Sequence, residues 1–235
     1  MTKILHFIPG TMCDARVWQP VRDLIKPAFD TAYIPLETAQ SADEFRDRFH
    51  QAHDQSAAPL NLVAFSMGGY LALEFAIRNP EKVASLVTVC TSAFGLHEKE
   101  KAQRQAALHY LETHTYRGIA DARIKQMLHP DHFQDNNIKQ TMRDMDQDIG
   151  LEILKIQLRE TSERENLYPG LSKITCPTLI VGGDADPFLT SHQRAEMASA
   201  IPNCQTVEAL KSGHMLPLEQ PDWLAGAIND FHARL

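Results

Sequence analysis

Residues 60–73 carry the sequence Leu60-Asn61-Leu62-Val63-Ala64-Phe65-Ser66-Met67-Gly68-Gly69-Tyr70-Leu71-Ala72-Leu73. The apolar run at 62–65 predicts a short buried strand. A helical pattern of apolar and small residues begins directly after Ser66. Ala64 and Gly68 are small enough for the strand and helix backbones to pass close together. The stretch therefore predicts a turn that leaves the Ser66 hydroxyl clear of the sheet, at the positive end of a helix.

Strand and helix patterns alternate along the rest of the chain. Apolar runs predict further strands at 4–8, 31–36 and 83–89, within 176–187, and at 205–210. Helices are expected at 17–25 and 42–55, after Ser66 as far as residue 78, and from near Pro221. Because strands separated by helices build parallel sheets, the order predicts an α/β fold with a mostly parallel sheet and helices on both faces.

Residues 93–173 differ in character from the segments on either side. Charged residues become more frequent, strand-like alternation disappears, and apolar residues recur at helical spacing. Breaks are expected at 129–131, at Gly150 and at 168–170, so that about four helices fill the segment. The chain thus divides into a sheet domain, residues 1–92 and 174–235, and a helical insertion, residues 93–173, before the last two strands.

The composition argues against several classes of partner. The formal net charge is −7 and Lys and Arg do not cluster, which argues against nucleic acid. No apolar run reaches the length of a membrane span, and the apolar residues at the N-terminus are too few for a signal peptide. We therefore expect a cytoplasmic protein without a membrane partner. Neither the four cysteines nor the histidines of the insertion have metal-ligand spacing, so no metal is expected (His97, His109, His114, His129 and His132).

The turn at Ser66 resembles the G-x-S-x-G nucleophile elbow of the α/β-hydrolase superfamily, with Ala64 in the first glycine position. The resemblance covers nearly the whole chain, is weakest in the insertion, and is strongest to the serine esterase and enol-lactonase branch. It implies an α/β-hydrolase fold in which Ser66 is the nucleophile of a Ser-His-Asp triad. It also implies that residues 93–173 form a helical cap over the serine.

Two later turns match the positions of the acid and the base in this superfamily. A strand ends in Gly183-Asp184-Ala185-Asp186, which resembles the Gly-x-x-Asp turn that holds the triad acid, so Asp186 is the expected acid. Asp184 is the alternative, because a turn accepts either carboxylate. Gly213-His214 follows the last predicted strand, where the family keeps its general base. The chain order serine, acid, histidine is that of the superfamily.

The loop after the first strand resembles the oxyanion loop of the superfamily, which usually reads His-Gly-x. Here the sequence is Pro9-Gly10-Thr11, with Pro9 in place of the histidine. By position, the backbone N–H of Thr11 is one donor of the oxyanion hole, and the N–H of Met67 is the other.

The resemblance implies hydrolysis of a small-molecule carboxylic ester or thioester through an acyl-enzyme, without a cofactor, by a monomer or weak homodimer. A serine at position 66 argues against the branches that use a carboxylate nucleophile. The alternatives are a cofactor-free lyase or C–C bond hydrolase that uses the same triad, and a ligand-binding protein with weak turnover. A lyase acting on a bulky carboxylate would need cationic side chains in the pocket, and the candidates are Arg16, Arg123, Arg143 and Arg159.

Overall fold

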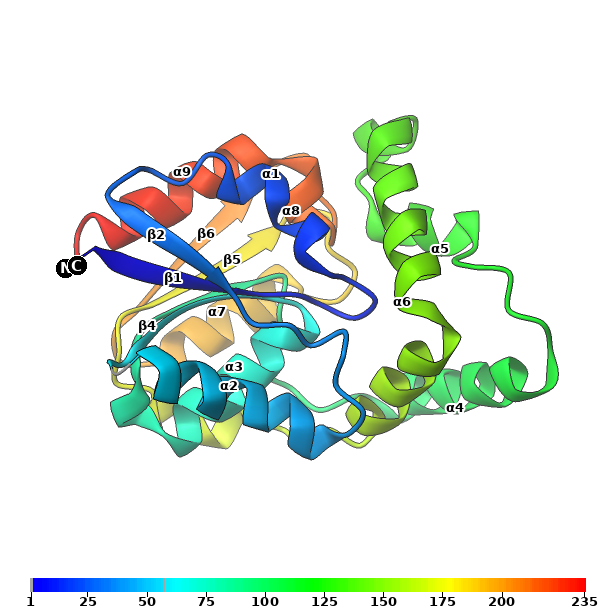
Figure 1. The fold of residues 1–235 in the computed structure, drawn as a ribbon, viewed down its shortest axis with the longest axis horizontal. Coiled ribbons are helices and arrows are strands. Elements are labelled where there is room, and N and C mark those ends of the chain that lie inside the picture. The colour runs from blue at the N-terminus through cyan, green and yellow to red at the C-terminus, as the bar shows by residue number, and fades with distance from the viewer. Residues whose placement is uncertain (1, 57) are drawn as a thin grey trace.

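The computed structural model describes residues 2–56 and 58–235. Its six strands form a parallel sheet in the order β2-β1-β3-β4-β5-β6 (Figure 1). The strands are β1 (Lys3–Ile8), β2 (Phe29–Tyr33), β3 (Leu60–Phe65), β4 (Val83–Val89), β5 (Thr178–Gly183) and β6 (Cys204–Ala209). The expected α/β architecture is confirmed, and every strand pair is parallel.

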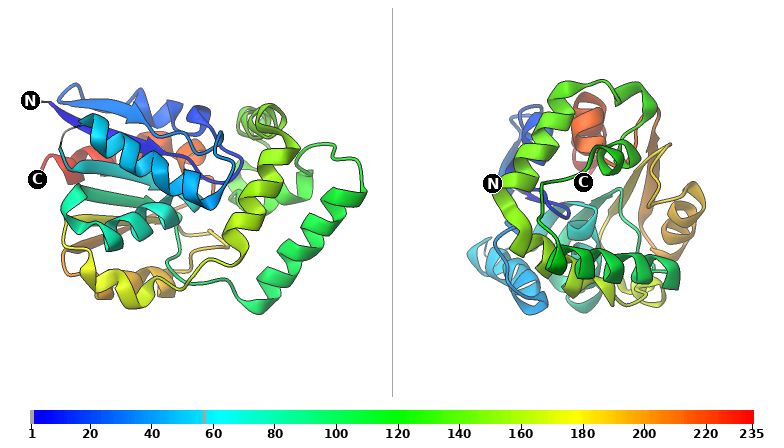
Figure 2. Two further views of the ribbon diagram at one scale, coloured as in Figure 1. Left: turned by 60° about the horizontal axis from the view of Figure 1, so that its bottom comes forward. Right: turned by 90° about the vertical axis from the view of Figure 1, so that its right-hand side faces the viewer.

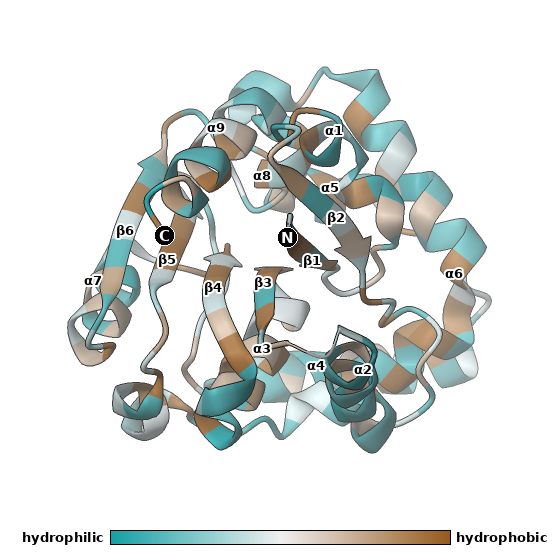
Figure 3. Ribbon diagram, turned by 60° about the vertical axis from the view of Figure 1, so that its left-hand side comes forward, coloured by the Kyte–Doolittle hydropathy of each residue, from teal (hydrophilic) through white to brown (hydrophobic). Residues whose placement is uncertain are grey.

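Helices cover both faces of the sheet. One face carries α1 (Gln19–Arg22), α8 (Leu216–Glu219) and α9 (Pro221–His232), and the other carries α2 (Ala42–Ser56), α3 (Met67–Arg78) and α7 (Ser191–Ala200) (Figure 1). Successive side chains of a strand point to opposite faces. Accordingly Leu62 packs in the core under α2 and α3, while its neighbour Val63 packs in the core under α1 and α9. Figure 3 shows hydrophobic colour along much of the sheet and hydrophilic colour on the outer sides of α2 and α9.

Two predicted elements near the N-terminus were placed wrongly. The second strand ends at Tyr33 instead of running from 31 to 36, although Ile34 and Leu36 are buried. An apolar pattern indicates burial, and the side chains of a loop packed on the core are buried as well. The helix expected at 17–25 is divided into η1 (Ala15–Val17) and α1, because Pro20 lacks an N–H and is tolerated only in a first helical turn.

Among its described residues the segment between β4 and β5 contains three α-helices, and the longest consists of two helical stretches that meet at a kink, in agreement with the expected number of about four. These are α4 (Glu98–Thr113), α5 (Asp121–Met127) and α6 (Asn136–Ser162), with the short η3 (Pro130–His132) and η4 (Tyr168–Lys173). The predicted break at Gly150 is present as a kink within α6, where its φ is 82°. Helices α4, α5 and α6 stand beyond the carboxyl ends of the strands (Figures 1 and 2). In the described part of the chain, even the long α6 is not apolar enough to cross a membrane.

Candidate active site

The turn at Ser66 has the geometry that its small neighbours predict. Strand β3 ends at Phe65 and helix α3 begins at Met67, so Ser66 alone makes the turn, with φ 51° and ψ −115°. Such a backbone conformation is strained for a residue with a side chain and persists only where its surroundings enforce it. A Cβ on Gly68 would clash with the carbonyl oxygen of Pro9, so the close approach of the two backbones requires glycine at position 68.

Three side chains from separate loops meet at the carboxyl edge of the sheet. His214 Nε2 lies 3.0 Å from Ser66 Oγ, and His214 Nδ1 lies 3.0 Å from Asp186 Oδ1. Ser66 follows β3, Asp186 follows β5 and His214 follows β6, so the sheet itself brings them together. His214 and Asp186 are buried, with 6% and 7% of their surface exposed. The arrangement joins a hydroxyl, an imidazole and a carboxylate in one line of hydrogen bonds.

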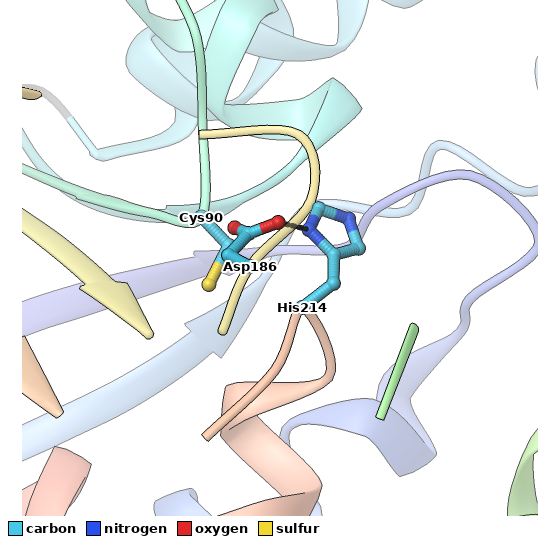
Figure 4. A group of neighbouring side chains, drawn as sticks. All are labelled: Cys90, Asp186 and His214. Carbon is cyan, nitrogen blue, oxygen red and sulfur yellow. Dashed lines mark hydrogen bonds and ion pairs between the residues drawn. The ribbon is translucent and has the colours of Figure 1, made fainter. Parts of the chain in front are cut away.

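The carboxylate of Asp186 is held in its charged form. Burial alone raises its pKa, but the facing His214 and the N–H of Phe188, which donates at 2.9 Å, together bring the pKa below its usual value. The Cys90 thiol lies beside the same carboxylate (Figure 4). Burial, followed by the charge of Asp186, raises the pKa of Cys90 well above its usual value, so this cysteine stays a neutral thiol.

Cys90, Asp186 and His214 are also the one group of potential metal ligands in the described residues whose atoms lie close enough together to share an ion. Within this group, Asp186 Oδ1 and His214 Nδ1 bond to each other and the Cys90 thiol is neutral, whereas a metal needs deprotonated ligands. The histidines of residues 93–173 do not belong to it.

The alternative acid, Asp184, lies elsewhere in the same turn. Its Oδ1 accepts a hydrogen bond of 3.0 Å from the N–H of Ser212, and its side chain is exposed. Asp184 thus holds the loop that carries His214, while Asp186 contacts the imidazole itself.

The loop of His214 is also bonded to the helices inserted between β4 and β5. The N–H groups of His214 and Met215 donate to the carbonyl oxygen of Met127, at 2.8 and 3.2 Å. The buried carboxylate of Glu219 accepts from His129 N at 2.7 Å and from Gly213 N at 3.1 Å. Burial raises the pKa of Glu219. The sequence carries no signal for this role, because both partners are backbone groups and His129 belongs to a distant segment.

The two expected oxyanion donors lie beside the serine. Thr11, Met67 and Ser66 share the lining of one cavity of about 40 Å³. Met67 is the first residue of α3, where a backbone N–H has no partner within the helix. The neighbouring Met12, with φ 52°, donates its N–H to Gln157 Oε1 at 2.8 Å. Gln157 lies on α6, fully buried, and was not identified from the sequence.

The arginines that line this cavity differ from those expected. The lining contains Arg104 and Arg164, together with Tyr70 and Thr161, and none of the four arginines named from the sequence is among its described residues. Arg16 instead pairs with Asp14 and Asp148, Arg143 pairs with Asp121, Arg159 is exposed, and Arg123 lies over the ring of Phe188. Helical spacing alone did not indicate which side of each inserted helix faces Ser66.

Comparison with known proteins gives one family. The model of the alpha/beta hydrolase fold family matches residues 25–221. The human monoacylglycerol lipase ABHD6 is 29% identical over 186 residues, which are 74% of this chain and 55% of that protein. A pimeloyl-[acyl-carrier protein] methyl ester esterase of Legionella pneumophila is 22% identical over 240 residues, which are 93% of this chain and 90% of the esterase.

Solved structures show the same fold. A thermophilic esterase of Thermogutta terrifontis, with malate bound, superposes with a TM-score of 0.85 at 22% identity and covers 99% of this chain and 90% of that one. Several of the curated relatives are longer proteins, and the chain spans 55% to 64% of the length of three of them.

Proposed function

The chain belongs to the alpha/beta hydrolase fold family, and from that premise we propose that it is a serine hydrolase of small-molecule carboxylic esters or thioesters. One observation carries the proposal. The Ser66 hydroxyl, the His214 imidazole and the Asp186 carboxylate are linked by two hydrogen bonds of 3.0 Å beside a cavity. The lipase and esterases among the relatives act on the same type of bond.

The proposed reaction has two halves. His214 takes the proton of Ser66 while the serine oxygen attacks the substrate carbonyl carbon, and then gives that proton to the departing alcohol or thiol. Water repeats the attack on the acyl-enzyme and releases the acid. Asp186, charged because its pKa lies below the usual value, orients the imidazole and stabilises the imidazolium.

The backbone N–H groups of Thr11 and Met67 are the proposed oxyanion hole. Both residues line the cavity with Ser66, and the start of α3 at Met67 favours negative charge. Each such donor accounts for about a hundred- to a thousand-fold in rate in comparable sites. The hydrogen bond from Met12 to Gln157 holds the loop that presents the Thr11 donor.

Residues 93–173 are the proposed cap on a sheet domain formed by residues 1–92 and 174–235. Helices α4 and α6 supply Arg104 and Thr161 to the lining of the cavity beside Ser66. A volume of about 40 Å³ is far below that of sites that enclose large ligands. We therefore expect short acyl groups to be preferred.

A lyase or C–C bond hydrolase that uses the same three residues is the second candidate. It is favoured by Arg104 and Arg164, because cationic side chains at the cavity suit a substrate with a carboxylate. Such an enzyme would cleave simple esters slowly or not at all.

The test is hydrolysis of 4-nitrophenyl esters from acetate to octanoate by the native protein and by Ser66→Ala. We expect the highest kcat/KM for short chains and a loss of at least about a thousand-fold in the variant, because only binding and the oxyanion hole remain. An inert native protein, or equal activity of the variant, would contradict the proposal and favour the lyase.

A further inference from the structure

The cavity beside Ser66 has a positively charged lining in a chain whose formal net charge is −7. Seven described residues line it, and Arg104 and Arg164 are the charged ones among them. No carboxylate belongs to this set. The sign of the local charge is therefore opposite to that of the whole protein.

Arg164 lies in the cavity wall without a counter-ion. Its guanidinium stands 5.1 Å from the ring centre of Tyr70, and its buried Nε has no hydrogen-bond partner within the described residues. The same part of the chain places no carboxylate within ion-pair distance of Arg164. Burial and the nearby charge of Arg104 lower the pKa of Arg164 to about 10. An anion in the cavity would relieve both unfavourable effects.

Arg104 lies close to Arg164, and Arg123 lies near Arg104. Arg104, on α4, donates to Thr161 Oγ1 at 3.0 Å and contacts Glu100 on its own helix at 3.3 Å. Arg123, on α5, stands 5.1 Å from the ring centre of Phe188, and that ring is 4.7 Å from the ring of His214. Two separate segments of the insertion thus bring arginines, Arg104 and Arg164, to the cavity.

Several arginines elsewhere in the molecule have carboxylate partners. Arg16 and Arg143 each contact an aspartate at 2.5 Å, and the buried Arg194 pairs with Glu208. A buried charge without a partner is costly. Within the described residues, Arg48 also has a buried Nε without a hydrogen bond and pairs with no carboxylate, so Arg164 differs from it in lining the cavity of the nucleophile.

We propose that Arg164 and Arg104 bind a carboxylate of the substrate, so that the enzyme hydrolyses half-esters or half-thioesters of short dicarboxylic acids. The inference rests on the proposed hydrolase function. The planar guanidinium matches a carboxylate in a two-pronged hydrogen bond. The arginines and the serine line the same cavity of about 40 Å³. The substrate carboxylate therefore lies only a few bonds from the scissile carbonyl.

The arginines also remove an electrostatic obstacle to the reaction. Attack by Ser66 places negative charge on the carbonyl oxygen, and a second negative charge a few bonds away repels it. Neutralised by guanidinium groups, the substrate carboxylate no longer opposes that step. Hydrolysis consumes one water and releases an alcohol or thiol together with the dicarboxylate.

The test compares monomethyl glutarate with methyl valerate, which has the same chain length but no carboxylate, by following the release of methanol. We expect the native enzyme to favour the glutarate ester by about ten-fold or more in kcat/KM. Arg164→Met lowers the value for the glutarate ester by about ten- to a hundred-fold and that for the valerate ester by less than about three-fold. Arg164→Lys, which keeps the positive charge, retains part of the preference for the glutarate ester.

Controls separate this inference from the function on which it rests. Arg117→Gln removes a positive charge from an exposed position of the insertion and leaves the ratio of the two esters unchanged. Activity on methyl valerate reports whether each variant is folded. A native ratio near one, or an equal loss on both esters in Arg164→Met and Arg104→Gln, overturns the carboxylate subsite while the hydrolase stands.

Failure of the proposed function has a different signature. Neither ester is then cleaved in a Ser66-dependent way, and the subsite is judged by binding alone. Glutarate raises the Tm of Ser66→Ala but not that of Ser66→Ala/Arg164→Met if the subsite exists. Equal shifts in both proteins contradict it.

Discussion

The loops at the carboxyl ends of the strands and the segment 93–173 contribute to the site in different ways. The strand-end loops hold Ser66, Asp186 and His214, and their positions follow from backbone geometry. The inserted segment supplies Arg104 and Gln157, whose positions depend on which helix face packs toward the serine. A turn that places a reacting side chain has a short sequence motif. The helix side chains that line the cavity have almost none.

The first test replaces, one at a time, the two carboxylates of the turn that follows β5. Asp186→Asn should lower kcat by about ten-thousand-fold, because the amide favours the wrong tautomer of His214. Asp184→Asn should change kcat by less than about three-fold, since the amide oxygen still accepts from Ser212 N. Steady-state kinetics on one ester measures kcat for both variants, and a Tm equal to that of the native protein shows that each is folded. Similar losses in the two variants would contradict the assignment of the acid.

A second test addresses the backbone constraint at the serine. Gly68→Ala should lower the free energy of unfolding by about 3 kcal/mol and abolish activity, because the new Cβ meets the carbonyl of Pro9 and neither backbone can yield. Gly226→Ala is the matched control. Its Cβ would meet nothing within 4 Å on the exposed side of α9, so stability should rise by about 0.5–1 kcal/mol. Urea unfolding of both variants gives the comparison.

A third test sharpens the contribution of the insertion. Gln157→Leu should lower kcat by about ten-fold with little change in KM, because the buried N–H of Met12 loses its acceptor and the oxyanion loop relaxes. Gln140→Leu, at an exposed position of the same helix, should leave both constants unchanged. If KM rises and kcat is constant, Gln157 shapes the pocket and does not position the loop.

The smallest effect is expected in the pH dependence of stability, where the two buried carboxylates Asp186 and Glu219 have opposite signs. The pKa of Asp186 is lowered in the fold, so its contribution is present above its unfolded pKa and is lost as pH falls through the folded value. The pKa of Glu219 is raised, so its contribution grows as pH falls through the folded value and declines as pH rises.

Glu219→Gln should therefore remove a gain in stability on acidification. The free energy of unfolding, measured in urea between pH 7 and pH 5, should increase less on acidification in the variant than in the native protein. A larger increase in the variant would mean that Glu219 is not the group that takes up the proton.

Sequence reasoning identified the sheet and the residues that the sheet brings together. Strand β4 was predicted at its observed bounds, and helix α3 at its observed end, because apolar runs and the stop at Pro80 are local signals. The residues Ser66, Asp186 and His214 were named because each lies in a turn after a strand that resembles a motif of the α/β-hydrolase superfamily.

The remaining features depend on tertiary packing. The buried Ile34 and Leu36 extended the predicted second strand too far, since a loop packed on the core has the same pattern as a strand. Arg164 has no local signal, because its place in the cavity follows from the path of the chain after α6. Glu219 likewise bonds to backbone groups, and one of them, His129 N, is remote in sequence.

The central claim is that Ser66 is an activated nucleophile, and covalent labelling tests it most directly. A fluorophosphonate should react with the native protein to give one adduct, with loss of fluoride, and peptide mass spectrometry should place the adduct on Ser66. Ser66→Ala should remain unlabelled, and Asp186→Asn should label far more slowly than the native protein. Equal labelling of Ser66→Ala, or no labelling of the native protein under conditions where it is folded, would contradict the account.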